Sequence, residues 1–363
     1  MRYGVVVMPD IDKLDIKKIL IIDLAFIGDV ILSGPLTMAI RQKWPEAELV
    51  MLTVPLTAPV AEMLPAIDRV LAYDKKGAHR GLGGMWQMAK ELRRERFDLA
   101  VCMNFALRGA AVARLAGIPY RLGYDAQHAG WFLTWVASHI RDGIKHETLN
   151  HLEVLKPWGV GADSLDEEAL RLKLVPGREA VASFEAKAAK WQLSGQGGYY
   201  VLCPIGSYER KNLPLPLAVQ LIRQLEGEKP VYLIGGSGEK AALSAMAKAG
   251  HIGEDRVLAG SLSLPELAVF LQRAAAMVSV DTGPMHIAQA VQCPTVAVFG
   301  PTAPEVWGPK NSNSRTIYLA ESCSPCWGKG ECSGSRCMER IKANMVLEAL
   351  ASIQPFEKVK TKA

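Results

Sequence analysis

The residues best suited to chemistry lie together at positions 281–286. Asp281, Thr282 and His286 follow directly on the apolar run 276–280 and supply a carboxylate, a hydroxyl and an imidazole. The residues between them suit the first turn of a helix, and the free N–H groups of such a turn favour phosphate. The stretch could therefore hold a phosphorylated sugar. Alternatively, Asp281 or Thr282 serves only as a helix cap.

Asp29 is a second candidate for chemistry. With Gly28 before it, it follows the apolar run 19–22 and opens a helical pattern. A carboxylate at this place can take a proton from an attacking hydroxyl group. Asp is also among the best helix caps, and Asp29 considered alone favours that alternative.

A third candidate is the loop 206–214, which contains Ser207 and Lys211. Lys211 could stabilise negative charge that develops on a leaving phosphate. The alternative is a solvated loop with two exposed cations. A glycine cluster, 235–238, precedes Glu239, which could contact a ribose, but it lacks the dinucleotide-binding pattern, and we expect no cofactor.

Short apolar strands alternate with helical segments along the chain, which predicts an α/β fold with doubly wound parallel sheets. We expect two domains, 1–193 and 199–345, a C-terminal helix or tail, 346–363, and a linker in the glycine-rich stretch 194–198. One large domain is the alternative, but it is disfavoured at 363 residues. Ligands bind such sheets at the carboxyl ends of the strands, where all three candidates fall.

Composition narrows the class of protein. The net charge of +5 is too small to indicate nucleic acid and is compatible with an acidic substrate or an anionic membrane surface. The chain has no apolar run long enough to cross a membrane, and its N-terminal apolar run is too short for a signal peptide. We therefore expect a cytoplasmic enzyme.

The seven cysteines fall into two groups. Three lie in or beside apolar strands, where we expect buried, inert thiols: Cys102, Cys203 and Cys293. The other four have the spacing C-x2-C-x5-C-x4-C, which could chelate zinc or an iron–sulfur cluster: Cys323, Cys326, Cys332 and Cys337. Reduced thiols or a labile disulfide are the alternatives, and we favour them.

The motif at 281–286, together with 294–302, resembles the signature of glycosyltransferase family 9, the bacterial heptosyltransferases. The similarity extends over nearly the whole chain and includes 28–30, 121–124 and 146–152. One departure is Leu213, which stands where the family usually has tryptophan.

The resemblance implies a GT-B fold, with an N-terminal acceptor domain and a C-terminal nucleotide-sugar domain facing a central cleft. It implies inverting transfer of heptose from ADP-heptose to the lipopolysaccharide inner core at the cytoplasmic membrane face, without a metal ion. Asp29 would be the base, with Gly28 on the acceptor side, and Lys211 would stabilise the leaving group. The donor would be bound by Ser207, Lys211, Glu239, Asp281, Thr282, Gly283, Pro284 and His286.

Three other functions remain open from the sequence. The chain could use another nucleotide-sugar within the same family. It could be a sugar-nucleotide epimerase of GT-B fold, which would act without an acceptor. It could also be a non-catalytic nucleotide- or glycan-binding protein, although the presence of Asp29 argues against this.

Overall fold

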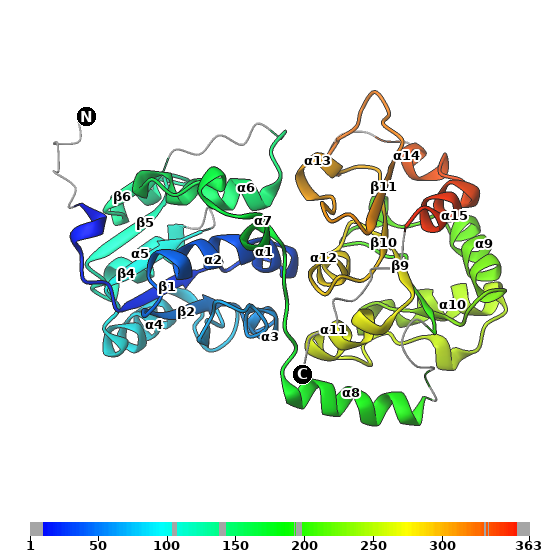
Figure 1. Ribbon diagram of the computed structural model, residues 1–363, viewed down its shortest axis with the longest axis horizontal. Helices are drawn as coiled ribbons and strands as arrows, with labels where there is room; N and C mark the ends of the chain where they lie inside the picture. The colour runs from blue at the N-terminus through cyan, green and yellow to red at the C-terminus, as the bar shows by residue number, and fades with distance from the viewer. Residues whose placement is uncertain are drawn as a thin grey trace. The chain divides into compact units, whose positions relative to one another are not determined.

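The computed structural model describes residues 10–103, 107–137, 143–191, 193, 198–329, 332 and 334–353. The chain divides into two compact units, Met1–Leu172 and Lys173–Ala363 (Figure 1). Each unit contains one parallel sheet with helices, in agreement with the predicted α/β class. None of the helices in these described ranges is both long enough and apolar enough to cross a membrane.

The first unit has a sheet of order β3-β2-β1-β4-β5-β6. Its centre is apolar because β1 lies between β2 and β4 and its last four residues are buried. The helices form two groups, one containing α4 and α5 and the other containing α1, α2, α3, α6 and α7. The strands are β1 (Lys18–Ile22), β2 (Glu48–Thr53), β3 (Arg69–Ala72), β4 (Leu99–Cys102), β5 (Tyr120–Tyr124) and β6 (Trp135–Ala137). The helices are α1 (Ile27–Leu32), α2 (Gly34–Lys43), α3 (Ala58–Ala61), α4 (Gly81–Glu95), α5 (Leu107–Leu115), α6 (Glu147–Leu152) and α7 (Glu167–Leu170).

The second unit has a sheet of order β11-β10-β9-β7-β8. In Figure 1, α9, α10 and α15 lie on one side of this sheet and α11 and α12 on the other. The strands are β7 (Tyr200–Cys203), β8 (Val231–Leu233), β9 (Ala276–Val280), β10 (Thr295–Phe299) and β11 (Ser314–Tyr318). The helices are α8 (Arg178–Lys190), α9 (Leu215–Glu226), α10 (Lys240–Gly250), α11 (Leu264–Arg273), α12 (Gly283–Ala290), α13 (Pro304–Trp307), α14 (Arg336–Glu339) and α15 (Ala343–Ala351).

Both sheets have a topological switch point. In the first, the chain leaves β1 for β2 on one side and later returns to β4 on the other; in the second, β7 lies between β8 and β9 in the same way. At such a point the loops that leave two neighbouring strands run in opposite directions along the sheet. A crevice therefore forms between them. Asp29 follows β1, whereas the loop with Lys211 follows β7 and Asp281 follows β9. The topology thus places all three candidates at switch points.

The division between the units falls earlier than the predicted domain boundary. Helix α8 belongs to the second unit, where it packs against α11 through an edge-to-face pair of phenylalanines and two ion pairs. Apart from residue 198, the predicted linker 194–198 lies outside the described residues. At the other end, α15 begins at Ala343 and buries Val346 in the core of the second unit, so the predicted start of a tail at 346 falls inside this helix. Residues 354–363 also lie outside the described ranges.

Candidate functional site

The carboxylate of Asp281 forms the centre of the candidate site in the second unit. It follows β9 directly and is 5% exposed. Its Oδ2 accepts hydrogen bonds from Lys211 Nζ at 2.7 Å and from Thr302 Oγ1 at 2.7 Å. Thr282 is the N-cap residue of α12, yet its side chain makes no cap hydrogen bond. The two side chains that could have been mere helix caps therefore make no cap bond, and Asp281 is engaged by a cation and a hydroxyl.

Lys211 reaches Asp281 from the loop that follows β7. It ends the 3₁₀ turn Glu209–Lys211, and its Nζ also lies 3.3 Å from the backbone oxygen of Asp281. The ammonium group stands 5.1 Å from the centroid of the Tyr208 ring, at a distance where a cation is attracted to the ring. Gly206 gives Lys211 its room, because a Cβ at position 206 would come within 2.6 Å of Lys211 Cβ. The loop thus holds a nearly buried cation at the carboxyl ends of two strands.

Two polar atoms near this ion pair lack hydrogen-bond partners among the described residues, which is rare for buried groups in folded proteins. They are the Tyr208 hydroxyl and His286 Nδ1. Burial, with a smaller contribution from the charge of Asp281, raises the pKa of Tyr208 to about 12, and burial lowers the pKa of His286 to about 4. Tyr208 is therefore a neutral hydrogen-bond donor at pH 7, and His286 is an uncharged imidazole. A bound ligand could satisfy both groups.

The other predicted donor residues have different surroundings. Ser207 is exposed in the loop after β7. Glu239 Oε2 accepts the N–H of Gly236 at 2.7 Å, so its carboxylate caps the local turn rather than lying open to a ribose. Gly283 and Pro284 form the first turn of α12, as predicted from the sequence. Leu213, the departure from the family pattern, is 2% exposed in the hydrophobic core and therefore packs inside the unit.

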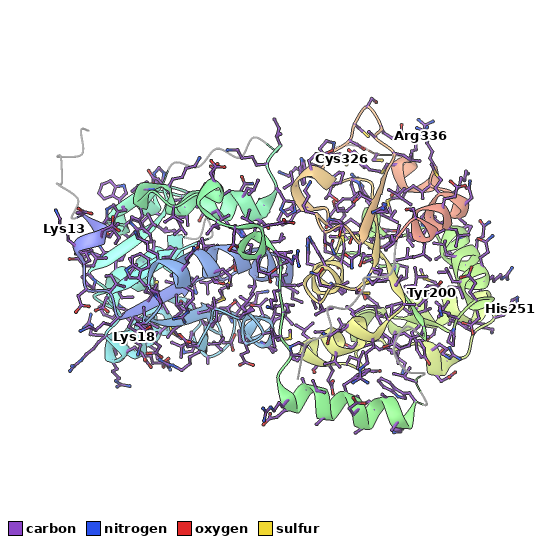
Figure 2. The ribbon with its side chains drawn as sticks, viewed as in Figure 1. Lys13, Lys18, Tyr200, His251, Cys326 and Arg336 are labelled. Carbon is purple, nitrogen blue, oxygen red and sulfur yellow. The ribbon has the colours of Figure 1, made fainter. Side chains whose placement is uncertain are left out.

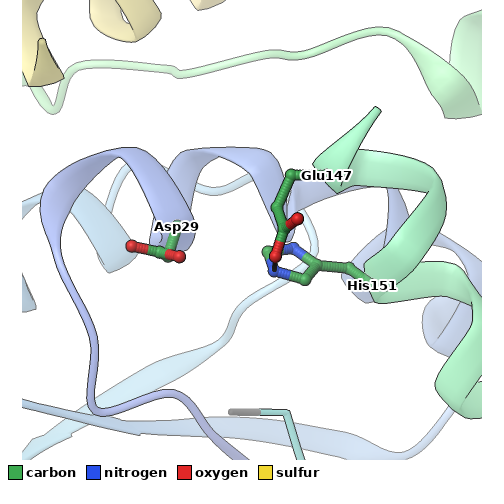
Figure 3. A group of neighbouring side chains, drawn as sticks. All are labelled: Asp29, Glu147 and His151. Atoms are coloured by element: carbon green, nitrogen blue, oxygen red, sulfur yellow. Dashed lines mark ion pairs between the residues drawn. The ribbon is translucent and has the colours of Figure 1, made fainter. Parts of the chain in front are cut away.

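The first unit brings Asp29 together with two residues of α6. Ligating atoms of Asp29, Glu147 and His151 lie within 4.8 Å of one another (Figure 3). Asp29 is in the first turn of α1 and its Oδ2 accepts the N–H of Phe26 at 3.3 Å, so Phe26, not Asp29, is the N-cap residue. This group of side chains can exchange protons, and one histidine with two carboxylates could also hold a divalent cation.

The C-terminal cysteines line one cavity of about 110 Å³ with Arg210 and Arg336. Cys326 and Arg336 of this cavity are labelled in Figure 2. All four are free thiols, and in the part of the chain that the structure describes no three of their sulfurs lie within 4.8 Å of one another. Burial raises the pKa of Cys337. The three cysteines of the strands are buried, as predicted: Cys102, Cys203 and Cys293.

Four residues around Asp281 and Asp29 were not predicted from the sequence as functional candidates: Thr302, Tyr208, Glu147 and His151. Thr302 ended the 294–302 motif, and Tyr208 stood in the loop that was singled out. Glu147 and His151 are four residues apart on a helix, a spacing that places both side chains on one face. That spacing, and the resemblance of 146–152 to a segment of the family, were the signals for them in the sequence.

Comparisons with known proteins agree with this architecture. The chain is similar to Lipopolysaccharide heptosyltransferase 2 of Escherichia coli (strain K12), with 23% identity over 308 residues, covering 83% of this chain and 88% of that protein. A solved structure, the glycosyl transferase family 9 protein from Veillonella parvula DSM 2008, gives a TM-score of 0.81 at 21% identity and covers 93% of this chain and 97% of that one. The E. coli ADP-heptose lps heptosyltransferase II gives 0.77 at 22% identity, covering 92% and 97%.

The fold is therefore of the GT-B type, as predicted. The model of glycosyltransferase family 9 (heptosyltransferase) matches residues 85–335, which is more than half of the chain. The chain belongs to glycosyltransferase family 9 and is a glycosyltransferase.

Proposed function

We propose that this glycosyltransferase moves a heptose from ADP-heptose to the inner core of lipopolysaccharide, with inversion and without a divalent ion. The names of its relatives support this choice of sugar and acceptor. The observation that carries the proposal is the Lys211–Asp281 ion pair at the ends of β7 and β9, beside the first turn of α12. A cation and free backbone N–H groups suit a diphosphate, and a carboxylate suits sugar hydroxyls.

The reaction needs a base and a stabilised leaving group. We assign Asp29 as the base that takes the proton from the acceptor hydroxyl as its oxygen bonds to the anomeric carbon. The bond from that carbon to the diphosphate breaks at the same time, and its electron pair leaves with ADP. Lys211 stabilises the charge that develops on the diphosphate, so this cation performs the task that Mg²⁺ has in other transferases.

Binding of the donor would involve the polar groups around the ion pair. Both hydrogen bonds to the Asp281 carboxylate fall on Oδ2, so its Oδ1 can accept a sugar hydroxyl. The N–H groups of Thr282 and Gly283 would bind phosphate, and His286 would act as a neutral partner. Ser207 and Glu239 remain donor contacts in this proposal, although Glu239 would first have to release Gly236. The acceptor is amphiphilic, so we also propose peripheral contact with the cytoplasmic face of the membrane.

Calorimetric titration with ADP-, UDP- and GDP-sugars tests the choice of donor. We expect ADP-heptose to bind tightest, with and without EDTA, and transfer to lipopolysaccharide acceptor to survive chelation. Tighter binding of a UDP- or GDP-sugar would refute the donor, and loss of transfer in EDTA would refute metal independence. Asp29→Asn should abolish transfer and leave ADP affinity intact, so unchanged turnover would remove Asp29 as the base.

A further inference from the structure

The face of α6 that points toward α1 carries two buried polar side chains. Glu147 is 2% exposed and His151 is 3% exposed. Neither ring nitrogen of His151 has a hydrogen-bond partner among the described residues. An imidazole that is removed from water without hydrogen bonds destabilises the fold, so such a group usually has a function.

The pair is held in place from within the first unit. Asn150 Nδ2 donates to Glu147 Oε2 at 3.0 Å, and the Tyr124 hydroxyl donates to the backbone oxygen of Asn150. The other carboxylate oxygen of Glu147 lies 3.7 Å from His151 Nε2, within reach of an ion pair. The imidazole is thus fixed beside one carboxylate, and it faces a second one on α1, where Asp29 lies within 4.8 Å (Figure 3).

The other charged groups on the elements packed against α6 are already paired. Helix α2 carries Arg41 and Lys43, which bind Asp68 and Asp12. The 3₁₀ helix Glu153–Trp158 carries Glu153, which binds Lys145 and Lys156. Asp29 is therefore the charged group of these packed elements that shares a cluster with His151.

We propose that Glu147 and His151 are positioning residues for Asp29: the imidazole, held by Glu147, fixes the Asp29 carboxylate and keeps it ionised for the attack of the acceptor. This inference rests on the proposed role of Asp29 as the base. Two carboxylates this close to each other disfavour joint ionisation, and in this proposal the imidazole within reach of both supplies the proton that offsets one of the two charges. When Asp29 takes the acceptor proton, the neighbouring imidazole and Glu147 keep the site balanced in charge.

The test compares three variants of the full-length protein. His151→Phe fills the volume without a ring N–H, His151→Gln keeps an N–H donor, and Thr148→Val is the matched control. Thr148 is buried on the same helix and its hydroxyl also lacks a partner among the described residues. The measurements are kcat, KM and the pH profile of kcat/KM with ADP-heptose and acceptor, with thermal melting to establish folding.

We expect His151→Phe to lower kcat about ten- to a hundredfold, because the base loses its orientation, with KM for the donor unchanged. The acidic limb of the pH profile of this variant should move to higher pH by about one pH unit, since without the imidazole the charge of Glu147 raises the apparent pKa of Asp29. His151→Gln should recover part of kcat and keep the displaced limb. Thr148→Val should match the wild type in kcat and in the position of the acidic limb.

Three results would overturn the inference. The first is a wild-type pH profile in a folded His151→Phe or His151→Gln protein. The second is an equal loss of kcat in Thr148→Val, which would mean a purely structural role for this face of α6. The third is a stoichiometric divalent ion whose removal from the wild type abolishes turnover and whose binding needs His151. Wild-type turnover in Asp29→Asn would instead refute the base assignment itself, so the two failures are distinguishable.

Discussion

Replacing Lys211 by methionine removes the charge of the buried ion pair and keeps a side chain of similar length. The pair has a separation of 2.7 Å and side chains that are 12% and 7% exposed. At an effective dielectric constant of about 20 the attraction is about 6 kcal/mol before desolvation, and removing one partner of such a pair costs about 3 kcal/mol of stability. For a unit of this size that loss lowers Tm by about 6 to 12 °C.

The catalytic effect of Lys211→Met should be larger than the effect on folding. Removal of one group that stabilises developing charge lowers kcat about a hundred- to a thousandfold. The assay is release of ADP from ADP-heptose with acceptor present, at a temperature where melting shows the variant to be folded. ADP affinity, measured by calorimetry, should also fall because the diphosphate loses a cation.

Lys187→Met is the matched control. Lys187 lies in the same unit and pairs with Glu266 at the same distance, 2.7 Å. It should lose stability without losing kcat, and it should lose less stability than Lys211→Met because Lys187 is 35% exposed. The reasoning about the leaving group is refuted if a folded Lys211→Met protein keeps wild-type kcat, or if both variants lose kcat equally.

Three further predictions concern the second unit. Gly206→Ala should displace Lys211 and weaken ADP binding. Gly238→Ala should leave ADP binding unchanged, because a Cβ at position 238 meets nothing within 4 Å. Equal ADP affinities of the two variants in calorimetry would contradict the role of Gly206. Burial lowers the pKa of His286 to about 4, so the ratio of ADP affinities between wild type and His286→Gln should stay constant between about pH 5.5 and 8; a ratio that titrates near pH 6.5 would show a charged imidazole. Burial acts to raise the pKa of Glu266, but hydrogen bonds, led by the one from Lys187, lower it to about 2. The stability that Glu266 contributes is therefore complete above pH 4.5 and is lost as pH falls toward 2. The Tm of Glu266→Gln should depend less on pH in that range than the Tm of the wild type, and an unchanged slope would contradict the assignment.

The central elements of both sheets could be predicted from the sequence because their strands are continuous apolar runs. β9 and β10 are buried at every position, and the helix between them begins at a Gly-Pro pair. β11 was not predicted because it is an edge strand with polar residues, and only two of its five residues are buried. β5 was not predicted as a strand either; its first two residues are only partly buried, and it lies next to β6, the edge strand of the other sheet. The apolar pair at 257–258 forms only an isolated bridge, between Val257 and Leu233.

The candidate sites show a different limit. Lys211 and Asp281 could each be named from residue type and local motif, but their ion pair joins residues far apart in sequence. Only the strand order, which places β7 next to β9, brings the two loops together. For Glu147 and His151 the obstacle was burial: the sequence shows two polar residues on one helical face, a pattern typical of a solvated surface. The packing of α6 against α1 and α2 reverses that interpretation.

The packing of α8 against α11 determines where this chain can be divided into fragments that stay folded. Phe184 and Phe270 are fully buried against each other, with ring centroids 6.0 Å apart, and Lys187 reaches across to Glu266. A recombinant fragment that starts after the glycine-rich stretch would lack α8. The Phe270 ring would then be exposed and Glu266 would lose its counterion, so the fragment should aggregate. Limited digestion between Leu172 and Gly177 should instead release a C-terminal half that stays folded by itself.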